Sequence, residues 1–268
     1  MPELPEVETT RRGVASHLEG SQLQRCVIRE SRLRWPLQIP ENLLGQRLVE
    51  VTRRGKYLLF LFEYGTLIIH LGMSGRLRVL PTTQSHEKHD HVDLVFTNGK
   101  MLRYHDPRRF GSIHWQPEGS VHWTLQHLGL EPLVDEFNGD YLFKQTRQRN
   151  SGVKSLIMNS QIVVGVGNIY ANEALFLAGV RPQRKCAKLT RAESVRLVIA
   201  IKNVLEDAIK AGGTTLRDYF GADGETGYFK MALHVYGRGG KPCLRCTTPL
   251  KIVKNSQRQS VYCPQCQR

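Results

Sequence analysis

The last 26 residues contain two cysteine pairs, and this feature constrains the fold more than any other in the chain. Cys243 and Cys246 form one Cys-x2-Cys pair, Cys263 and Cys266 form the other, and 16 residues separate the pairs. This spacing is typical of a four-cysteine zinc ribbon. Each pair places its thiolates on one tight turn, and the segment between the pairs is long enough for a β-hairpin. The C-terminal segment is therefore predicted to fold around one zinc ion.

Four thiolates complete a tetrahedral coordination shell and leave no open position, so the predicted zinc ion is structural. Its binding typically supplies about 10–16 kcal/mol, which is enough to fold a small unit that lacks its own core. An iron–sulfur cluster is the alternative, but the Lys, Arg and Gln residues around the ligands favour a ribbon that faces DNA. Lys254, Gln257 and Arg258 are candidates for phosphate contacts. Solvated hairpin residues, or a ribbon that serves as a protein adaptor, are the alternatives for these side chains.

The charge of the chain indicates a polyanionic partner. Lys and Arg number 38 against 24 Asp and Glu, which gives a formal net charge of +14. The excess is spread along the sequence, as expected for basic surfaces on folded domains that bind nucleic acid, but charge alone does not separate DNA from RNA. No apolar run approaches the ~20 residues that span a bilayer, and the acidic N-terminus is unlike a secretory signal. The clustered cysteines fit a reducing compartment, so a cytoplasmic location without a membrane partner is expected. Cys26 and Cys186 have no assigned role.

The N-terminal half reads as a helix followed by a β-rich region. Val7, Thr10, Val14 and Leu18 recur at helical spacing, and Gly20 is a plausible stop. From about residue 24 to 116, short β-rich runs are broken by Gly, Asn-Gly and Asp-Pro. This pattern of short strands and turns predicts a compact β-sandwich or barrel on which the first helix packs. The clearest runs are 57–62, 67–70, 92–96 and 101–104.

From about residue 141 the hydrophobic period becomes helical. Thr190 and Glu193 have capping-box spacing, and the helix that they open is predicted to reach Ala211 before a Gly-Gly pair. A shorter helix is predicted over 169–178, after a glycine-rich turn, and the glycine-rich stretch 220–228 is predicted to be a mobile loop. The buried stripe of the longer helix is expected to consist of Val195, Val198, Ile199, Leu205 and Ile209.

The N-terminus offers a particular nucleophile. Met1 precedes Pro2, and a small second residue normally permits removal of the initiator methionine, which leaves a secondary amine beside Glu3. An α-amino group has a reference pKa of about 7.7–8.0, so part of it is unprotonated near neutral pH. When a secondary amine attacks an aldehyde-level carbon, the product is a cationic iminium, which acts as an electron sink for elimination. A neighbouring carboxyl group can donate or accept protons. While Met1 is attached, the Pro2 nitrogen is an amide without nucleophilicity.

Several long motifs extend from the first residue to the last. They are Met1–Thr9, Gly55–Tyr57, Leu71–Gly75, Asp106–Gly111, Val164–Tyr170 and the terminal cysteine ribbon. In these motifs the chain resembles formamidopyrimidine-DNA glycosylase. The resemblance implies an α+β fold with an N-terminal β-sandwich that carries the first helix, a helical domain with a helix–two-turn–helix, and a four-cysteine zinc finger. The expected domains are 1–135, 136–230 and 231–268.

The resemblance also implies catalytic roles. Pro2 would be the nucleophile at the anomeric carbon of the damaged nucleotide, Glu3 would help to protonate the opened sugar, and Glu6 would support the pocket. Lys56 would contact the phosphate beside the lesion, which suits a lysine on a turn that leads into a strand. The residues 221–227 correspond to a loop over the extruded base.

Further DNA contacts follow from the same resemblance. Asn168 would bind phosphate together with the amides of the glycine-rich turn, and helix N-termini are anion sites on physical grounds as well. Arg258 would hold phosphate from the zinc hairpin, Lys154 would lie near the damaged base, and His89 would contact DNA. His89 and His91 with neighbouring aspartates also resemble a second metal cluster, although isolated histidines more often form hydrogen bonds.

Met73, Arg108 and Phe110 match the residues with which this family fills the gap left by an extruded base. An apolar wedge, an aromatic wedge and an arginine that binds the orphaned partner base suit that task. Ordinary core packing is the alternative for Met73 and Phe110. The flanking Gly72 and Gly75 favour an exposed loop tip for Met73.

Together these observations predict a bifunctional glycosylase and abasic-site lyase in the bacterial cytoplasm or nucleoid. It would act as a monomer on double-stranded DNA that contains oxidised purines (8-oxoguanine, formamidopyrimidines) or abasic sites. A Schiff base followed by β- and δ-elimination would cut the strand. The related endonuclease VIII-like family, which acts on oxidised pyrimidines, shares the N-terminal Pro-Glu and is the close alternative. A non-catalytic DNA-binding module would explain the charge and the zinc ribbon equally well.

Overall fold

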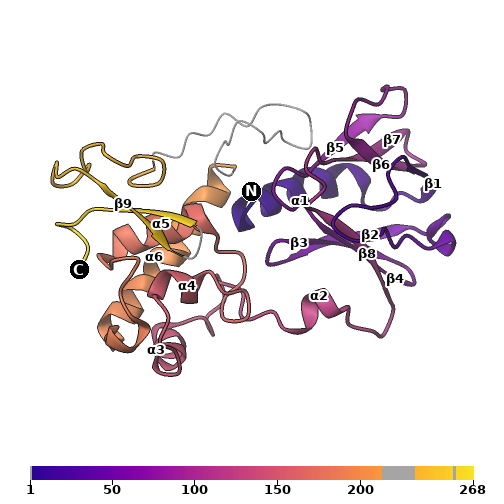
Figure 1. Ribbon diagram of the computed structural model, residues 1–268. Coiled ribbons are helices and arrows are strands. Elements are labelled where there is room, and N and C mark those ends of the chain that lie inside the picture. Colours follow the sequence, from indigo (N-terminus) through magenta and orange to yellow (C-terminus); the bar gives the residue numbers. More distant parts are fainter. Residues whose placement is uncertain (1, 213–232, 256–257) are drawn as a thin grey trace. The chain divides into compact units, whose positions relative to one another are not determined.

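The computed structural model describes residues 2–212, 233–255 and 258–268 (Figure 1). The chain divides into two compact units, of which the first contains residues 2–126 and the second contains residues 127–211 and 233–268. The predicted mobile loop at 220–228 lies outside the described residues. Within the described ranges, no helix is long and apolar enough to cross a membrane. The three-domain division stays a prediction, since the helical region and the cysteine ribbon share one compact unit.

The first unit is built on two antiparallel four-stranded sheets, with strand orders β1-β6-β7-β5 and β2-β3-β4-β8. Side chains from both sheets enter one apolar core. Strand β3 shows the expected period of two, because Leu58, Phe60 and Phe62 are buried. The predicted sandwich is confirmed, and each of the four predicted runs lies within a strand. The strands are β1 (Leu23–Ile28), β2 (Leu48–Arg54), β3 (Tyr57–Phe62), β4 (Gly65–His70), β5 (Arg76–Pro81), β6 (Asp90–Phe96), β7 (Lys100–His105) and β8 (Ser112–Pro117).

Helix α1 (Leu4–Leu18) packs against β2 and β5 in the first unit. Its four residues of the predicted stripe are all buried, as the helical spacing indicated. The helix ends at Leu18, and Gly20 adopts a φ of +83°, which agrees with the predicted stop. Two short elements complete this unit, the 3-10 helix Glu41–Leu43 and α2 (Trp123–Gln126).

Helix α5 occupies the centre of the second unit and is buried on nearly all sides. It begins at Asn168 and ends at Ala178, where Gly179 takes a left-handed conformation, so the predicted short helix is confirmed. Helices α6 and α4 pack against it. The elements around it are α3 (Gly139–Arg147), α4 (Val153–Ile157), the 3-10 helix Cys186–Lys188 and α6 (Arg191–Lys210).

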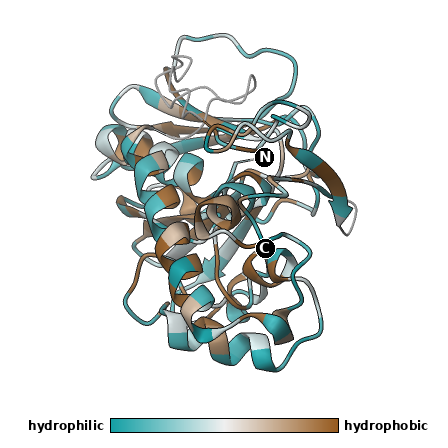
Figure 2. Ribbon diagram, turned by 90° about the vertical axis from the view of Figure 1, so that its left-hand side faces the viewer, coloured by the Kyte–Doolittle hydropathy of each residue, from teal (hydrophilic) through white to brown (hydrophobic). Residues whose placement is uncertain are grey.

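Helix α6 has the predicted capping box but not the whole predicted stripe. The Thr190 hydroxyl accepts a bond from the Glu193 amide at 3.2 Å, and the Glu193 carboxylate accepts one from the Thr190 amide at 2.8 Å. Val195 and Ile199 are 42% and 53% exposed, so the prediction that they are buried was wrong. Val195 lies at the edge of the buried face, directly beside Gly139 of α3, and Ile199 lies outside that face. The buried face contains Leu197, Val198, Ile201, Val204, Leu205 and Ala208. Hydrophobic and hydrophilic residues alternate along the helices in Figure 2, as in other amphipathic helices.

Strands β9 (Lys251–Asn255) and β10 (Arg258–Tyr262) form the hairpin predicted between the cysteine pairs. The hairpin and the segment before it pack on α5 through an apolar cluster that contains Phe176, Val235, Leu250 and Val261. The buried carboxylate of Glu173, also on α5, accepts bonds from three consecutive amides, those of residues 234–236, at 2.7–3.0 Å. The ribbon is therefore anchored to the central helix by both apolar and polar contacts.

Candidate nucleic-acid interface and metal centre

The N-terminal residues are fixed by the start of helix α1. Glu3 is the N-cap, and its side chain and that of Glu6 form a reciprocal capping box. The Glu6 carboxylate accepts a bond from the Glu3 amide at 2.9 Å. Glu3 and Glu6 are each 2% exposed, whereas Pro2 is only half-buried. Glu3, which directly follows the candidate nucleophile, and Glu6 thus lie at the positive end of the helix dipole.

Lys56 lies on the tight turn between β2 and β3, where Gly55 has a φ of +58°. This is the turn-to-strand position that the sequence predicted. Next to it, Tyr57, His70 and Ser112 stand opposite one another on three neighbouring strands, because Tyr57 pairs with His70 and His70 pairs with Ser112. Their side chains share one face of the sheet.

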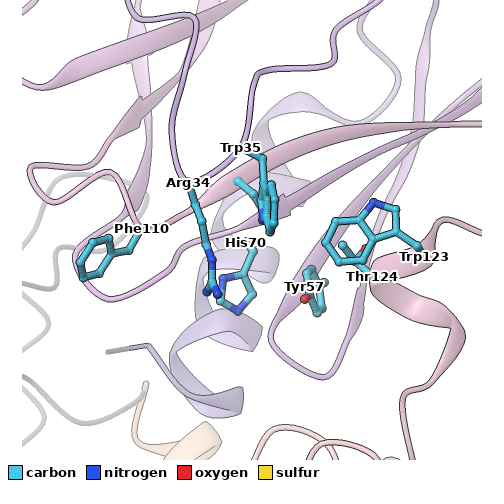
Figure 3. A pocket seen from close by; sticks show the side chains of 8 residues that line it. Arg34, Trp35, Tyr57, His70, Phe110, Trp123 and Thr124 are labelled. Carbon is cyan, nitrogen blue, oxygen red and sulfur yellow. The ribbon is translucent and has the colours of Figure 1, made fainter.

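A cavity of about 170 Å³ opens over this row, and sequence reasoning did not anticipate it. Figure 3 shows Arg34 and Trp35 extending from one loop, with Trp123 and Phe110 on opposite sides. Burial, followed by the charges of Lys56 and Arg34, lowers the pKa of His70 to about 4. The ring is therefore neutral at pH 7, and its Nδ1 atom accepts the Gly72 amide at 3.0 Å. The lining residues are Arg34, Trp35, Tyr57, His70, Phe110, Ser112, Trp123 and Thr124.

The three candidate wedge residues lie on two adjacent loops of the first unit. Met73 and Phe110 are 41% and 45% exposed, and Arg108 is exposed beside them. The Arg108 guanidinium carbon lies 4.7 Å from the centre of the Phe110 ring. Gly72 has a φ of +61°, and a Cβ there would overlap the backbone at Phe110. The loops therefore touch through their backbones, which leaves the side chains at the tips exposed.

His89 precedes strand β6 and has a φ of +74°. The pairing of β6 shifts between Asp90 and Val92, and His89 lies outside the strand, so His89 and His91 do not follow a regular strand alternation. Asp90 is already engaged in ion pairs with Arg78 and with His105 if that ring is protonated. Among the described residues, the only cluster of three or more potential metal-binding side chains is that of the four cysteines.

Lys154 and Asn168 meet in the second unit. Lys154 is 2% exposed, and its amine donates to the Asn168 side-chain oxygen at 2.7 Å. It also donates to the Ser260 hydroxyl at 2.7 Å and to the Gln259 carbonyl at 3.1 Å. Asn168 is the first residue of α5, so its side chain is oriented at a helix N-terminus. The buried contacts of Lys154 connect Asn168 to strand β10 of the ribbon. That Lys154 lies near a damaged base stays a prediction.

The four cysteine ligand atoms lie within 4.8 Å of one another. The Sγ atoms of Cys246 and Cys263 are 3.4 Å apart, and those of Cys243 and Cys266 are 3.9 Å apart. Tetrahedral zinc with Zn–S bonds of ~2.3 Å requires sulfur atoms about 3.8 Å apart, so the cluster fits a zinc ion. The Arg245 amide donates to the Cys243 sulfur and the Cys266 amide donates to the Cys263 sulfur, both at 3.4 Å. The cluster is a zinc finger with one structural site.

Arg258 is exposed at the first position of β10 in the same ribbon. Its guanidinium lies 4.0 Å from the Met158 sulfur, which is uncharged, so this contact leaves the positive charge of Arg258 in place. The first unit thus contains Pro2, Glu3, Lys56, the wedge residues and His89. The second unit contains Lys154, Asn168, Arg258 and the cysteines.

Comparison with known proteins identifies all three parts of the chain. Residues 1–113 match the formamidopyrimidine-DNA glycosylase N-terminal domain, residues 128–219 match the H2TH domain of that enzyme, and residues 240–268 match the zinc finger found in FPG and IleRS. Formamidopyrimidine-DNA glycosylases of Pseudomonas putida and Nitrosococcus oceani are 56% and 53% identical, over the full length of both chains in each case.

Solved structures agree with these matches. The MutM (Fpg) protein from Thermus thermophilus is 38% identical, with a TM-score of 0.90 over 99% of this chain and 98% of that one. Lactococcus lactis Fpg in complex with DNA that contains an abasic site is 31% identical, with a TM-score of 0.91 over 99% of both chains. A mutant of the same enzyme in complex with Fapy-dG DNA is 32% identical, with a TM-score of 0.92 over 100% of both. The chain therefore belongs to the formamidopyrimidine-DNA glycosylase family.

Proposed function

We propose that this protein excises oxidised purines, including 8-oxoguanine and formamidopyrimidines, from double-stranded DNA and then cuts the strand at the abasic site. The observation that carries the proposal is the buried capping box that fixes Glu3 beside the Pro2 amine. The relatives in complex with abasic-site DNA and Fapy-dG DNA support this choice of substrate. We further propose that it works as a monomer in the bacterial cytoplasm.

The chemistry begins once Met1 has been removed. The lone pair of the Pro2 nitrogen attacks the anomeric carbon, and the bond to the damaged base breaks with its electron pair leaving on the base. The N–H proton of Pro2 passes to the departing base. The Glu3 carboxyl donates a proton to the ring oxygen as the sugar opens, which yields a cationic iminium between Pro2 and the sugar. The iminium then accepts the electron pair of the neighbouring C2′–H bond, whose proton passes to solvent. This drives loss of the 3′ phosphate by β-elimination, and a second elimination releases the 5′ phosphate.

The remaining candidate residues bind and shape the DNA. Lys56, His89, Asn168 and Arg258 supply cations and polar groups to phosphates, in keeping with the net charge of +14. The wedge residues replace the extruded base in the stack. The zinc ion keeps the ribbon folded and takes no part in the reaction.

Borohydride trapping tests the proposal. The purified enzyme is incubated with a duplex that contains one 8-oxoguanine opposite cytosine, and the iminium is reduced to a stable covalent adduct. We expect an adduct that maps to Pro2 by mass spectrometry and is absent in Pro2→Gly. If Pro2→Gly cut the strand at the wild-type rate, covalent catalysis through Pro2 would be ruled out.

A second substrate separates the related activities. We expect faster excision of 8-oxoguanine than of thymine glycol from otherwise identical duplexes. A preference for thymine glycol would assign the chain the pyrimidine specificity of the endonuclease VIII-like family. Tight binding of both duplexes without any excision would indicate a non-catalytic DNA-binding module.

A further inference from the structure

We infer that Asp106 is a positioning residue for base extrusion, because it joins the loop of Met73 to the loop of Arg108 and Phe110. The inference rests on the proposed function, since it assigns these loops to DNA. Asp106 itself is fully buried, so it acts through the two loops rather than by touching DNA. Asp106 is the first residue of the motif Asp106–Gly111.

The Asp106 carboxylate accepts hydrogen bonds from three donors on different segments. Its Oδ1 atom accepts the Ser74 hydroxyl at 2.6 Å, which is one residue after Met73. Its Oδ2 atom accepts the Gly111 amide at 2.9 Å, one residue after Phe110, and the Tyr104 hydroxyl at 3.2 Å. The Ser74 oxygen in turn accepts the Arg108 amide at 3.2 Å. One buried side chain therefore holds both loops next to their functional tips.

The surrounding packing depends on the same arrangement. A Cβ on Gly111 would overlap the Tyr104 hydroxyl, and a Cβ on Gly75 would lie 2.8 Å from that oxygen. The Tyr104 hydroxyl thus occupies the space that the missing side chains leave, and it points at Asp106. The Asp106 carbonyl also bonds the His91 ring at 2.8 Å, which fixes the start of the second loop to the sheet.

This arrangement makes the wedge a single rigid group. Met73, Arg108 and Phe110 must enter the base stack together, and a loose loop would lose conformational entropy on insertion. Preorganisation by Asp106 removes that cost before DNA arrives. Asp106 should therefore affect the extrusion of the lesion from a stacked duplex, and it should have little effect on the chemistry at Pro2.

The choice of substitution follows from the donors. Asp106→Asn keeps an oxygen that accepts the Gly111 amide and the Tyr104 hydroxyl, while its NH₂ group can donate to the Ser74 oxygen. Asp106→Ala removes all three bonds and leaves buried donors without partners. A comparison of Asp106→Asn with Asp106→Ala therefore isolates the effect of the hydrogen bonds. Ser74→Ala is a milder variant that removes only the hydrogen bond between Ser74 and Asp106.

The experiment compares two substrates under single-turnover conditions. On a duplex with 8-oxoguanine opposite cytosine, we expect Asp106→Ala to cut about 100-fold more slowly than the wild type and Asp106→Asn to stay within about threefold. On a single-stranded oligonucleotide with an abasic site, no stack must be opened, so Asp106→Ala should stay within about threefold. The fluorescence rise of a 2-aminopurine beside the lesion, which reports unstacking, should be reduced in Asp106→Ala and retained in Asp106→Asn.

Equal losses of Asp106→Ala on both substrates would overturn the inference, as would a normal rate and a normal 2-aminopurine signal on the duplex. If Asp106→Ala does not fold, Ser74→Ala decides: a loss confined to the duplex supports the inference, and wild-type behaviour on both substrates contradicts it. Failure of the proposed function would appear differently, because the wild-type enzyme itself would then cut neither substrate.

Discussion

The Lys154 ammonium lies 2.7 Å from the side-chain oxygen of Asn168, and this contact orients Asn168 at the N-terminus of helix α5. The same amine bonds the Ser260 hydroxyl at 2.7 Å, so one buried charge links α4, α5 and strand β10. The residue proposed to bind phosphate and the zinc hairpin are thus held in a common arrangement. A lysine that is 2% exposed requires such partners, because an unpaired buried ammonium is costly.

Lys154→Met tests this link. The substitution keeps the apolar stem and removes the ammonium, which leaves the oxygens of Asn168 and Ser260 without their donor. We expect the second unit to lose about 2 kcal/mol of stability and the affinity for abasic-site duplex to fall. Denaturant unfolding and fluorescence anisotropy measure the two effects. Lys188→Met, at an exposed position, is the matched control, and identical behaviour of the two variants would contradict the assigned role.

Substitutions of Glu3 and Glu6 distinguish the role of these residues in capping helix α1 from a role in proton transfer. Glu3→Gln keeps a side-chain oxygen for the capping bond but has no carboxyl proton to donate, so we expect unchanged stability with excision slower by about 100-fold or more. Glu6→Ala breaks the reciprocal cap and should cost about 1 kcal/mol of stability. Thermal unfolding with single-turnover kinetics distinguishes these outcomes. A normal excision rate in Glu3→Gln would remove Glu3 from the chemistry.

Removal of zinc should unfold the ribbon and leave the first unit intact. The four cysteines hold the ion in a segment with few apolar residues of its own, whereas the β-sandwich has a separate core. We expect a strong chelator to weaken DNA binding by about tenfold or more, through loss of ribbon contacts such as that of Arg258. Hydrogen exchange with mass spectrometry should show that strands β1–β8 remain protected. Loss of protection throughout the chain would contradict this independence.

We expect His114 to contribute to the pH dependence of the free energy of unfolding. Burial, with a smaller effect of His122, lowers the pKa of His114 from 6.5 to about 4, and neither ring nitrogen has a hydrogen-bond partner among the described residues. Between pH 6.5 and 4 the unfolded chain takes up a proton that the folded chain does not, so stability falls as the pH decreases through this window. His114→Leu should therefore show a shallower decline in urea unfolding. His127→Leu, at an exposed site, should follow the wild type.

The sequence by itself determined the features that depend on local spacing. The cysteine pairs predicted the hairpin and the zinc site, because the two cysteines of each pair are only three positions apart and lie on one turn. The Thr190 capping box, the end of α1 near Gly20 and the β-rich runs were predicted for the same reason. The Pro2-Glu3 sequence, together with the family resemblance, predicts the nucleophile and its neighbour, and this assignment stays a prediction.

Only the tertiary structure decided which surfaces are buried and which distant side chains meet. Val195 and Ile199 are apolar at helical spacing, yet they are exposed, because the buried face of α6 is centred on Leu197, Ile201, Val204, Leu205 and Ala208. Asp106 and Ser74 are 32 residues apart, and the register of the sheets brings them together. Lys154 meets Ser260 across 106 residues. Such contacts depend on long-range packing, which no local pattern in a single sequence records.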